Sequence, residues 1–430
     1  MPEQSELAAQ RSRPPGPNAT VGRSEVSAYD QNPLIEACGP ILSFAQIARQ
    51  LLHLPPVPKH RDNGLQGHVL EHALGDVWRM HVPTPAGIQV AQSLDFMIRQ
   101  GYVHRRPRTA ATNRLLHGLP AIGGDQAAIQ LAAAVGGIAG VGKSEALGRA
   151  LNLKPQVVTH AEFPGMKGPV SQLIWLKLDV PESGRIADLA ESLFRATDDA
   201  LGTNYREQLA GGRARGGVNL AGDWLAKVRC NFLGVLVLDE VQNLFKIATK
   251  ARRTAANRGG RDRPELGIVD DQALKFILTL TNTSKIPVVV AGTPDGMSVL
   301  VTRMSTAQRI STEGYHEIPY AISADDAYFK KYFFPHLAAY QYLPERLHPG
   351  DELRCVVHRL SGGVSRIAIA VWIHGQRHAI GRGSQRLELE DLQAAADGPL
   401  RFMQPAVAAL LSQDPQRMAL YQDLLSHGNL

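Results

Sequence analysis

The sequence is poor in cysteine and in long apolar runs, and its start does not resemble a secretory signal. The three cysteines, Cys38, Cys230 and Cys355, lie far apart and include no C-x-x-C pair. This argues against a disulfide framework and against a zinc site. The longest nearly apolar runs, such as residues 131–141, are shorter than the roughly 18 residues needed to cross a bilayer. With no basic-then-apolar start, we expect a cytoplasmic protein without a membrane partner.

The overall composition is typical of a globular protein. The 430 residues are 44% hydrophobic and 20% charged, which allows two or three domains with substantial cores. The net charge of +6 is a weak indication of a polyanionic partner. Residues 1–28 contain no aromatic residue and are rich in Pro, Ser, Gly and charge, so we predict a disordered tail there.

Residues 137–144 match G-x-x-x-x-G-K-S/T, the pattern of a loop that wraps nucleotide phosphates. Gly137, Gly140 and Gly142 permit a tight backbone curl whose N–H groups face inward, forming an anion nest at the start of the next helix. In such a loop Lys143 reaches the β- and γ-phosphates, and the Ser144 hydroxyl coordinates Mg²⁺. The alternative for this stretch is a Gly-rich turn before an ordinary helix.

Strand-like and helix-like patterns alternate around this loop. Because strands alternate with helices, we expect a mostly parallel sheet covered by helices on both faces. The expected strands lie at 129–135, 156–160, 172–178, 233–239 and 286–292, and the expected helices at 145–151, 185–200 and 223–232. From about residue 322 the pattern is helical, and the final thirty residues look like a semi-ordered tail.

Two of these strands end in residues suited to catalysis. The apolar strand 233–239 ends in Asp239 and Glu240, at the edge where parallel sheets bind ligands. Asp239 would hold Mg²⁺ through water, and Glu240 would act as general base toward the attacking water. A solvated acidic turn is the alternative, but the spacing of 96 residues from Lys143 favours catalysis. Thr293, after strand 286–292, could contact the water or the γ-phosphate, or simply cap the following turn.

Three basic segments could track a nucleic-acid backbone. Residues 246–263 carry seven basic residues against one acid, 211–217 form a smaller Gly- and Arg-rich loop, and 99–108 contain a dense basic cluster. Their sequence alone does not identify any of them as a DNA-binding segment, because each is equally typical of a solvated loop or linker. A helix expected to begin near Arg366 could bring that guanidinium to the phosphates or leave it in solvent.

Taken together, these features resemble the AAA+ ATPases, and further stretches resemble the TnsC family. TnsC proteins are the AAA+ regulators of multi-component cut-and-paste transposons, related to TniB and more remotely to MuB. The resemblance runs from about residue 29 to the C-terminus. The stretches that carry it are 32–37, Gly101-Tyr102, Arg106-Pro107, 156–160, 172–179, 199–205, 282–294 and 376–380.

The resemblance implies an α/β fold: an AAA+ P-loop NTPase with a mostly parallel five-stranded sheet flanked by helices, a small helical lid and a helical N-terminal extension. It implies an ATP-dependent homo-oligomer, a ring or filament on duplex DNA. Such an oligomer would link a TniQ-type target-selection protein to transposase and endonuclease subunits without cutting DNA itself. The expected segments are a tail (1–28), the extension (29–115), the ATPase core (116–321), the lid (322–398) and a partner-binding tail (399–430).

The resemblance also implies roles for individual residues. ATP would be bound by Gly137, Gly140, Val141, Gly142, Lys143, Ser144, Glu145 and Arg366, although the family often carries an acidic residue at the position of Arg366. Ser144 and Asp239 would hold Mg²⁺, Glu240 would be the base, and Thr293 the first sensor. Arg309 would be the trans arginine finger, with Arg303 as the alternative. DNA backbone contacts would fall on Arg185, Thr203, Asn204, Tyr205 and Arg206.

Two other functions share the same core. One is another initiator-type AAA+ ATPase, such as a helicase loader, without transposon partners. The other is a nucleotide-gated scaffold with negligible hydrolysis, against which the intact Lys143, Asp239 and Glu240 argue.

Overall fold

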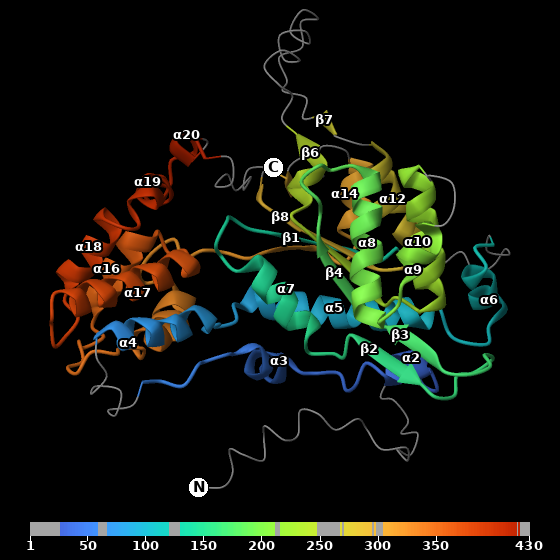
Figure 1. The fold of residues 1–430 in the computed structure, drawn as a ribbon, viewed down its shortest axis with the longest axis horizontal. Helices are drawn as coiled ribbons and strands as arrows, with labels where there is room; N and C mark the ends of the chain where they lie inside the picture. Colours follow the sequence, from blue (N-terminus) through green and yellow to red (C-terminus); the bar gives the residue numbers. More distant parts are fainter. Residues whose placement is uncertain are drawn as a thin grey trace, which may run out of the picture.

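The computed structural model describes residues 26–58, 67–119, 130–210, 216–246, 267–268, 271–294, 296–297, 304–418 and 420–421. An α/β core and a helical lid lie at the two ends of its longest axis, joined along one side by N-terminal helices (Figure 1). The predicted tail (1–28) falls almost entirely outside the described residues, as do residues 247–263 of the basic segment 246–263 and residues 211–215 of the basic segment 211–217.

A five-stranded parallel sheet forms the centre of the core, as predicted. Its order is β4-β5-β8-β1-β9, and every described pairing is parallel. Strands β5, β8 and β1 are buried at every residue, which explains their uninterrupted apolar sequences. The strands are β1 (Ala132–Gly136), β4 (Trp175–Asp179), β5 (Val235–Asp239), β8 (Val288–Gly292) and β9 (Tyr315–Glu317).

The single strand predicted over residues 172–178 is wrong, because the chain changes partners at Ile174. Strand β3 (Val170–Leu173) pairs antiparallel with β2 (Val157–His160) in a separate two-stranded sheet. The amide of Ile174 still donates to Gln156 O (2.8 Å), whereas its carbonyl accepts from Val235 N (3.1 Å). Strand β4 then begins at Trp175 and joins the main sheet. The predicted strand 156–160 therefore exists but lies outside the main sheet.

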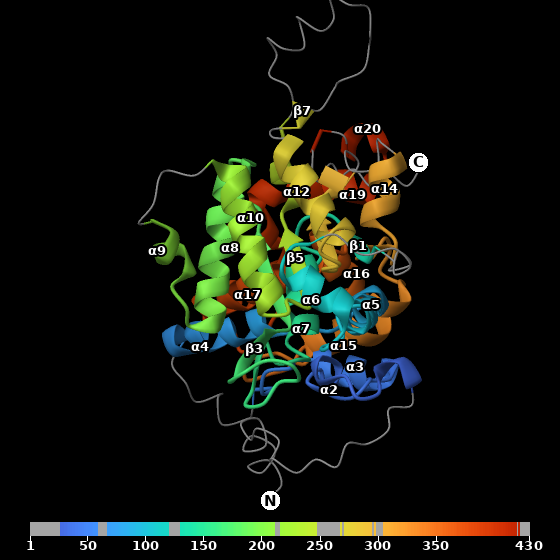
Figure 2. The same ribbon diagram turned by 90° about the vertical axis from the view of Figure 1, so that its right-hand side faces the viewer.

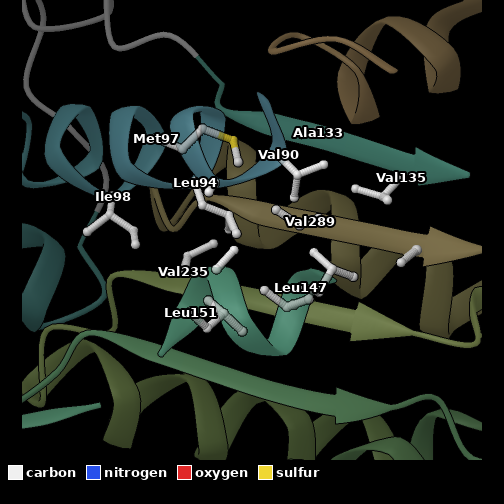
Figure 3. Packing of buried hydrophobic residues seen from close by; sticks show 14 of the residues in the cluster. Val90, Leu94, Met97, Ile98, Ala133, Val135, Leu147, Leu151, Val235 and Val289 are labelled. Atoms are coloured by element: carbon white, nitrogen blue, oxygen red, sulfur yellow. The ribbon is translucent and has the colours of Figure 1, made fainter. Parts of the chain in front are cut away.

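Helices cover both faces of the main sheet. Residues 235 and 237 of β5 pack into one hydrophobic cluster and residues 236 and 238 into another, as the two-residue period of a strand requires. The first cluster includes Leu94, Met97, Leu147 and Leu151 from the helices on its face (Figure 3). These helices are α5 (Pro85–Val103) and α7 (Lys143–Leu151), and the opposite face carries α8 (Ile186–Leu201), α10 (Gly217–Cys230) and α12 (Asp271–Asn282).

Helices α8 and α10 lie side by side in Figure 2. Helix α10 begins at Gly217, six residues before the predicted start at 223. A β-carbon on Gly217 would lie 2.7 Å from Ala187 N, so a glycine permits this close approach to α8. The other helices of the core and its N-terminal segment are α2 (Pro33–Glu36), α3 (Phe44–Leu51), α6 (Ala110–Leu116), α9 (Tyr205–Ala210) and α14 (Met304–Ile310), and β6 (Phe245–Lys246) pairs with β7 (Gly267–Ile268).

The lid has its own hydrophobic cluster around the fully buried Trp372. Part of the N-terminal extension joins it: Leu70, Leu74 and Val77 belong to the lid cluster, whereas α2, α3 and α5 pack on the sheet. The extension therefore packs against both the core and the lid. The elements of the lid cluster are α4 (Gly67–Ala73), η4 (Leu74–Arg79), α15 (Phe334–Ala338), α16 (Asp351–Ser361), α17 (Ser365–Gly381) and α18 (Leu389–Asp397). Helices α19 (Gln404–Ser412) and α20 (Pro415–Met418) follow, and their buried Leu410 and Met418 belong to the first cluster of the core.

No single helix within the described ranges has the length and apolar character needed to cross a bilayer. Taken together, the pair α16 and α17, bent by 113°, reaches the length and composition of a span.

Two arginines of the basic cluster 99–108 are structural. Arg99 is 4% exposed and donates to Asp95 and to the carbonyl of Gly39 (2.8 Å). Arg105 is 3% exposed and donates to carbonyls that precede β5, including Leu233 O. Burial lowers the pKa of Arg105 to about 10. The interpretation of this cluster as a DNA contact or a solvated linker is therefore wrong for both residues.

Candidate nucleotide-binding site

The loop between β1 and α7 has the backbone of a phosphate nest. Gly137, Gly140 and Gly142 have φ values of +151°, +84° and +98°, which only glycine adopts without strain. A β-carbon on Gly137 would also lie 2.7 Å from Ile318 O. The Lys143 ammonium folds back over this loop and donates to Gly137 O (2.7 Å) and Ile138 O (3.0 Å). The loop therefore presents a cationic, N–H-lined concavity at the start of α7.

The acidic pair lies beside this loop, at the end of β5. Asp239 is 1% exposed, and its Oδ1 accepts from Glu240 N (3.0 Å). Its Oδ2 lies 3.2 Å from Lys177 Nζ, within ion-pair range, but receives no well-aligned hydrogen bond from the described residues. A buried carboxylate oxygen that receives no hydrogen bond from the described residues is a suitable ligand for a hard cation. With the exposed Ser144 hydroxyl on α7, it supplies the oxygen donors that Mg²⁺ prefers.

Glu240 projects from a strained backbone into the same space. Its φ is +55°, a value that non-glycine residues adopt mainly where the surroundings enforce it. The side chain is exposed, and one carboxylate oxygen accepts from Gln242 Nε2. Gln242 Oε1 accepts from the backbone N of Thr293 (3.4 Å). The ends of β5 and β8 are thus joined through a residue that the sequence analysis did not select.

A cavity of about 1190 Å³ connects these groups, large enough for a nucleotide. Residues 139–146 of the loop and α7 line it, together with Glu240, Gln242 and Thr293. Arg366 lines it from the lid, where its backbone N donates to Gly140 O (3.3 Å). The structure therefore brings the predicted loop, Glu240, Thr293 and the lid arginine together at one cavity, and Asp239 lies directly beside Glu240.

The N-terminal extension supplies a further wall that the sequence analysis missed. Residues 78–84 line the cavity, including the half-exposed Trp78. The backbones of His53 and His81 hydrogen-bond each other in both directions (2.9 and 2.8 Å) and so hold this wall in place. Burial, together with the nearby Arg149, lowers the pKa of His81 to about 4. The ring is therefore neutral at pH 7. The sequence analysis predicted only a helical extension here.

Arg309, the predicted trans finger, lies elsewhere. It is exposed in the last turn of α14 and is not one of the described residues that line the cavity. Its alternative, Arg303, falls outside the described residues.

The five predicted DNA-contacting residues separate into two groups at opposite ends of α8. Arg185 is the exposed N-cap, and residues 203–206 follow the C-terminus, about 24 Å away for a sixteen-residue helix. Asp198 holds the turn by accepting from Thr203 Oγ1 and the backbone N–H groups of residues 205 and 206. Arg206 pairs with Glu191. Because the Arg206 guanidinium is already paired with Glu191, Arg185 is better suited to bind a DNA phosphate.

A match to a protein family agrees with the class that this fold and site define, an α/β protein with a phosphate-binding loop. Residues 130–300 match the family model described as AAA domain. The chain is similar to the ORC2 protein of Aeropyrum pernix, at 12% identity over 74% of this chain and 68% of that one, with a TM-score of 0.41. It is similar to the RuvB Holliday junction branch migration motor of Thermotoga maritima, at 11% identity over 66% and 64%, with a TM-score of 0.31.

Comparison with curated proteins gave no match. The parallel sheet, the phosphate loop and the AAA domain match identify an AAA+ P-loop fold with a nucleotide-binding site.

Proposed function

We propose that this protein is an ATP-dependent, DNA-binding AAA+ regulator of transposition, of the TnsC kind. The observation that carries the ATPase part is the cavity lined by Lys143, Glu240, Thr293 and Arg366, with Asp239 hydrogen-bonded to the Glu240 backbone beside it. The transposition part rests on the collinear stretches from 32–37 to 376–380 that resemble TnsC. ATP turnover would then set how long an oligomer persists on target DNA and activates the transposase.

The arrangement supports hydrolysis by an in-line water. The loop amides and Lys143 would bind the phosphates, and Ser144 and Asp239 would hold Mg²⁺, which supplies charge neutralisation when bound. Glu240 would take the proton as the water oxygen bonds to the γ-phosphorus. The bond from that phosphorus to the bridging oxygen breaks, and ADP leaves with the oxygen. Arg366 would stabilise charge on the phosphates from the lid.

The position of Arg309 supports an oligomer. Because this exposed arginine lies away from the cavity of its own subunit, it suits a role at the nucleotide of a neighbouring subunit. In such an oligomer, hydrolysis would depend on assembly. A ring or filament would bring Arg185 of successive subunits to the DNA backbone, where contacts are independent of sequence.

Electron microscopy on linear duplex DNA tests this proposal. Rings or filaments should form with a non-hydrolysable ATP analogue and be lost with ADP. The Lys143→Ala variant should fail to assemble with either nucleotide, because it lacks the ammonium that reaches the phosphates. Lys330→Ala, which removes an exposed lid lysine paired with Asp325, is the matched control and should assemble normally. Nucleotide-independent assembly, or monomers throughout, would contradict the proposal.

Activation of transposition is tested separately. On this proposal a transposase is encoded beside this chain, and it should insert donor DNA only when the wild-type protein and ATP are present. Assembly on DNA without any such stimulation would instead favour the helicase-loader type of function.

The DNA contact has its own prediction. Arg185→Ala should weaken duplex binding uniformly across sequences and reduce the slope of log K against log salt by about 1 per subunit. Arg206→Ala should weaken it less, since Glu191 already neutralises that charge. Fluorescence anisotropy at several salt concentrations measures both slopes. An unchanged slope for Arg185→Ala would remove this residue from the interface.

A further inference from the structure

Gln242 occupies the space between the ends of two neighbouring strands of the main sheet. It lies in the short helix η5 (Val241–Leu244), directly after β5 and Glu240. Its amide nitrogen donates to the Glu240 carboxylate, and its amide oxygen accepts from the backbone N of Thr293, 51 residues later (3.4 Å). Both partners line the nucleotide cavity, as Gln242 does itself.

The surrounding chain holds this side chain in place. A β-carbon on Gly292 would lie 2.8 Å from Gln242 Oε1, and one on Gly296 would lie 2.6 Å from Gln242 Cβ. Glycine at both positions therefore leaves room for the amide. Val241 and Leu244, on either side of the turn, are 0% and 2% exposed and anchor η5 in the core. The Gln242 side-chain amide therefore has little room to adopt another rotamer.

We propose that Gln242 is a positioning residue for hydrolysis, which orients Glu240 and couples it to the end of β8. The inference rests on the proposed ATPase function. Glu240 is exposed, so its carboxylate would otherwise sample several rotamers. One amide hydrogen bond fixes Oε2, leaves Oε1 for the attacking water and keeps the full negative charge needed by a general base.

The hydrogen bond between Thr293 N and Gln242 Oε1 makes the orientation of Glu240 depend on the bound nucleotide. Thr293 lies at the end of β8 and faces the cavity, where a γ-phosphate would contact it. Any displacement of the Thr293 backbone on binding ATP moves the acceptor end of the same amide that holds Glu240. Gln242 therefore links the state of the phosphate site to the position of the base. A misplacement of about 1 Å at such a site costs on the order of 100-fold in rate.

The test measures ATP turnover and nucleotide affinity of the full chain on duplex DNA. Gln242→Met keeps the approximate volume but removes both hydrogen bonds, and should lower kcat by about 10- to 100-fold. KM and the affinity for the ATP analogue should stay within about threefold of wild type. Gln242→Glu places a second carboxylate opposite Glu240 and should lower kcat at least as far. The control Gln393→Met removes a comparable amide–carboxylate contact, with Asp397, on the exposed face of α18.

A double variant separates positioning from a merely structural role. If Gln242 acts through Glu240, then Gln242→Met should add no further loss to Glu240→Gln. Additive losses, a kcat within twofold of wild type, or a parallel fall in analogue affinity and thermal stability would each overturn the inference. These outcomes leave the proposed function intact as long as wild type hydrolyses ATP and Glu240→Gln does not. Absence of turnover in wild type with DNA and all partners would overturn both.

Discussion

Replacing Glu240 by glutamine should lower ATP turnover by about 100- to 1000-fold while nucleotide binding survives, since general bases contribute on the order of 10² to 10⁴ in rate. Glutamine keeps the shape of the side chain but does not accept a proton at neutral pH. The loop glycines, Lys143 and Arg366 are untouched, so the affinity for ATP should change little. Assemblies on DNA should therefore persist much longer with ATP than those of wild type.

Phosphate release under multiple-turnover conditions measures the rate, and dissociation of labelled DNA after dilution measures the lifetime. Glu317→Gln is a suitable control because Glu317 is an exposed carboxylate at the end of β9, on the same edge of the sheet. It should behave as wild type. Wild-type turnover by Glu240→Gln would exclude Glu240 as the base, and loss of nucleotide binding would point to a structural role instead.

The centre of the fold could be predicted because its signals are local. Strands β1, β5 and β8 are buried on both faces, so each is an uninterrupted apolar run that ends in a polar or flexible residue. The change of partner at Ile174 has no such signal, because residues 172–178 read as one continuous strand. Only the positions of β2 and β5 determine where pairing with one ends and pairing with the other begins.

The candidate site likewise contains features that the sequence predicts and features that it does not. The phosphate loop and the pair Asp239–Glu240 follow from residue type and short spacing. The wall at residues 78–84 depends on how the N-terminal extension crosses from the core to the lid, and Gln242 depends on a contact with Thr293. Neither feature can be predicted from hydrophobic periodicity or from a sequence motif. A Gln two residues after an acidic pair is a weak signal until β8 is placed beside β5.

Several positions that carried the family resemblance act in packing. The Asn32 amide donates to Tyr102 O (3.0 Å), the Tyr102 hydroxyl donates to Phe232 O (2.9 Å), and the Gln172 amide donates to Leu34 O (2.9 Å). Asn32, Tyr102 and Gln172 are all fully buried. The Tyr102 and Gln172 bonds fasten the N-terminal extension to the core, whereas the Asn32 bond joins the start of α2 to α5 within the extension.

Replacing Trp372 by alanine should cost about 3–5 kcal/mol of lid stability, the usual effect of removing a buried large aromatic side chain. Trp372 is 0% exposed, and its indole donates to Tyr340 O (2.8 Å), which also accepts from the Gln376 amide (2.9 Å). Alanine leaves a cavity and removes one of these donors. Trp372→Phe fills most of the cavity and should cost less. Denaturant unfolding followed by circular dichroism gives the differences.

The same substitution should also weaken nucleotide binding, because Arg366 lies on the same helix as Trp372. The matched comparison is Trp224→Ala, which removes an equally buried indole that donates to Thr197 (2.9 Å) on the face of the sheet away from α7. It should destabilise the core by a similar amount but leave the folded protein's affinity for the ATP analogue near wild type. Equal losses of affinity in both variants would contradict a specific contribution of the lid to nucleotide binding; a loss confined to Trp372→Ala would support Arg366 and its helix as part of the phosphate site.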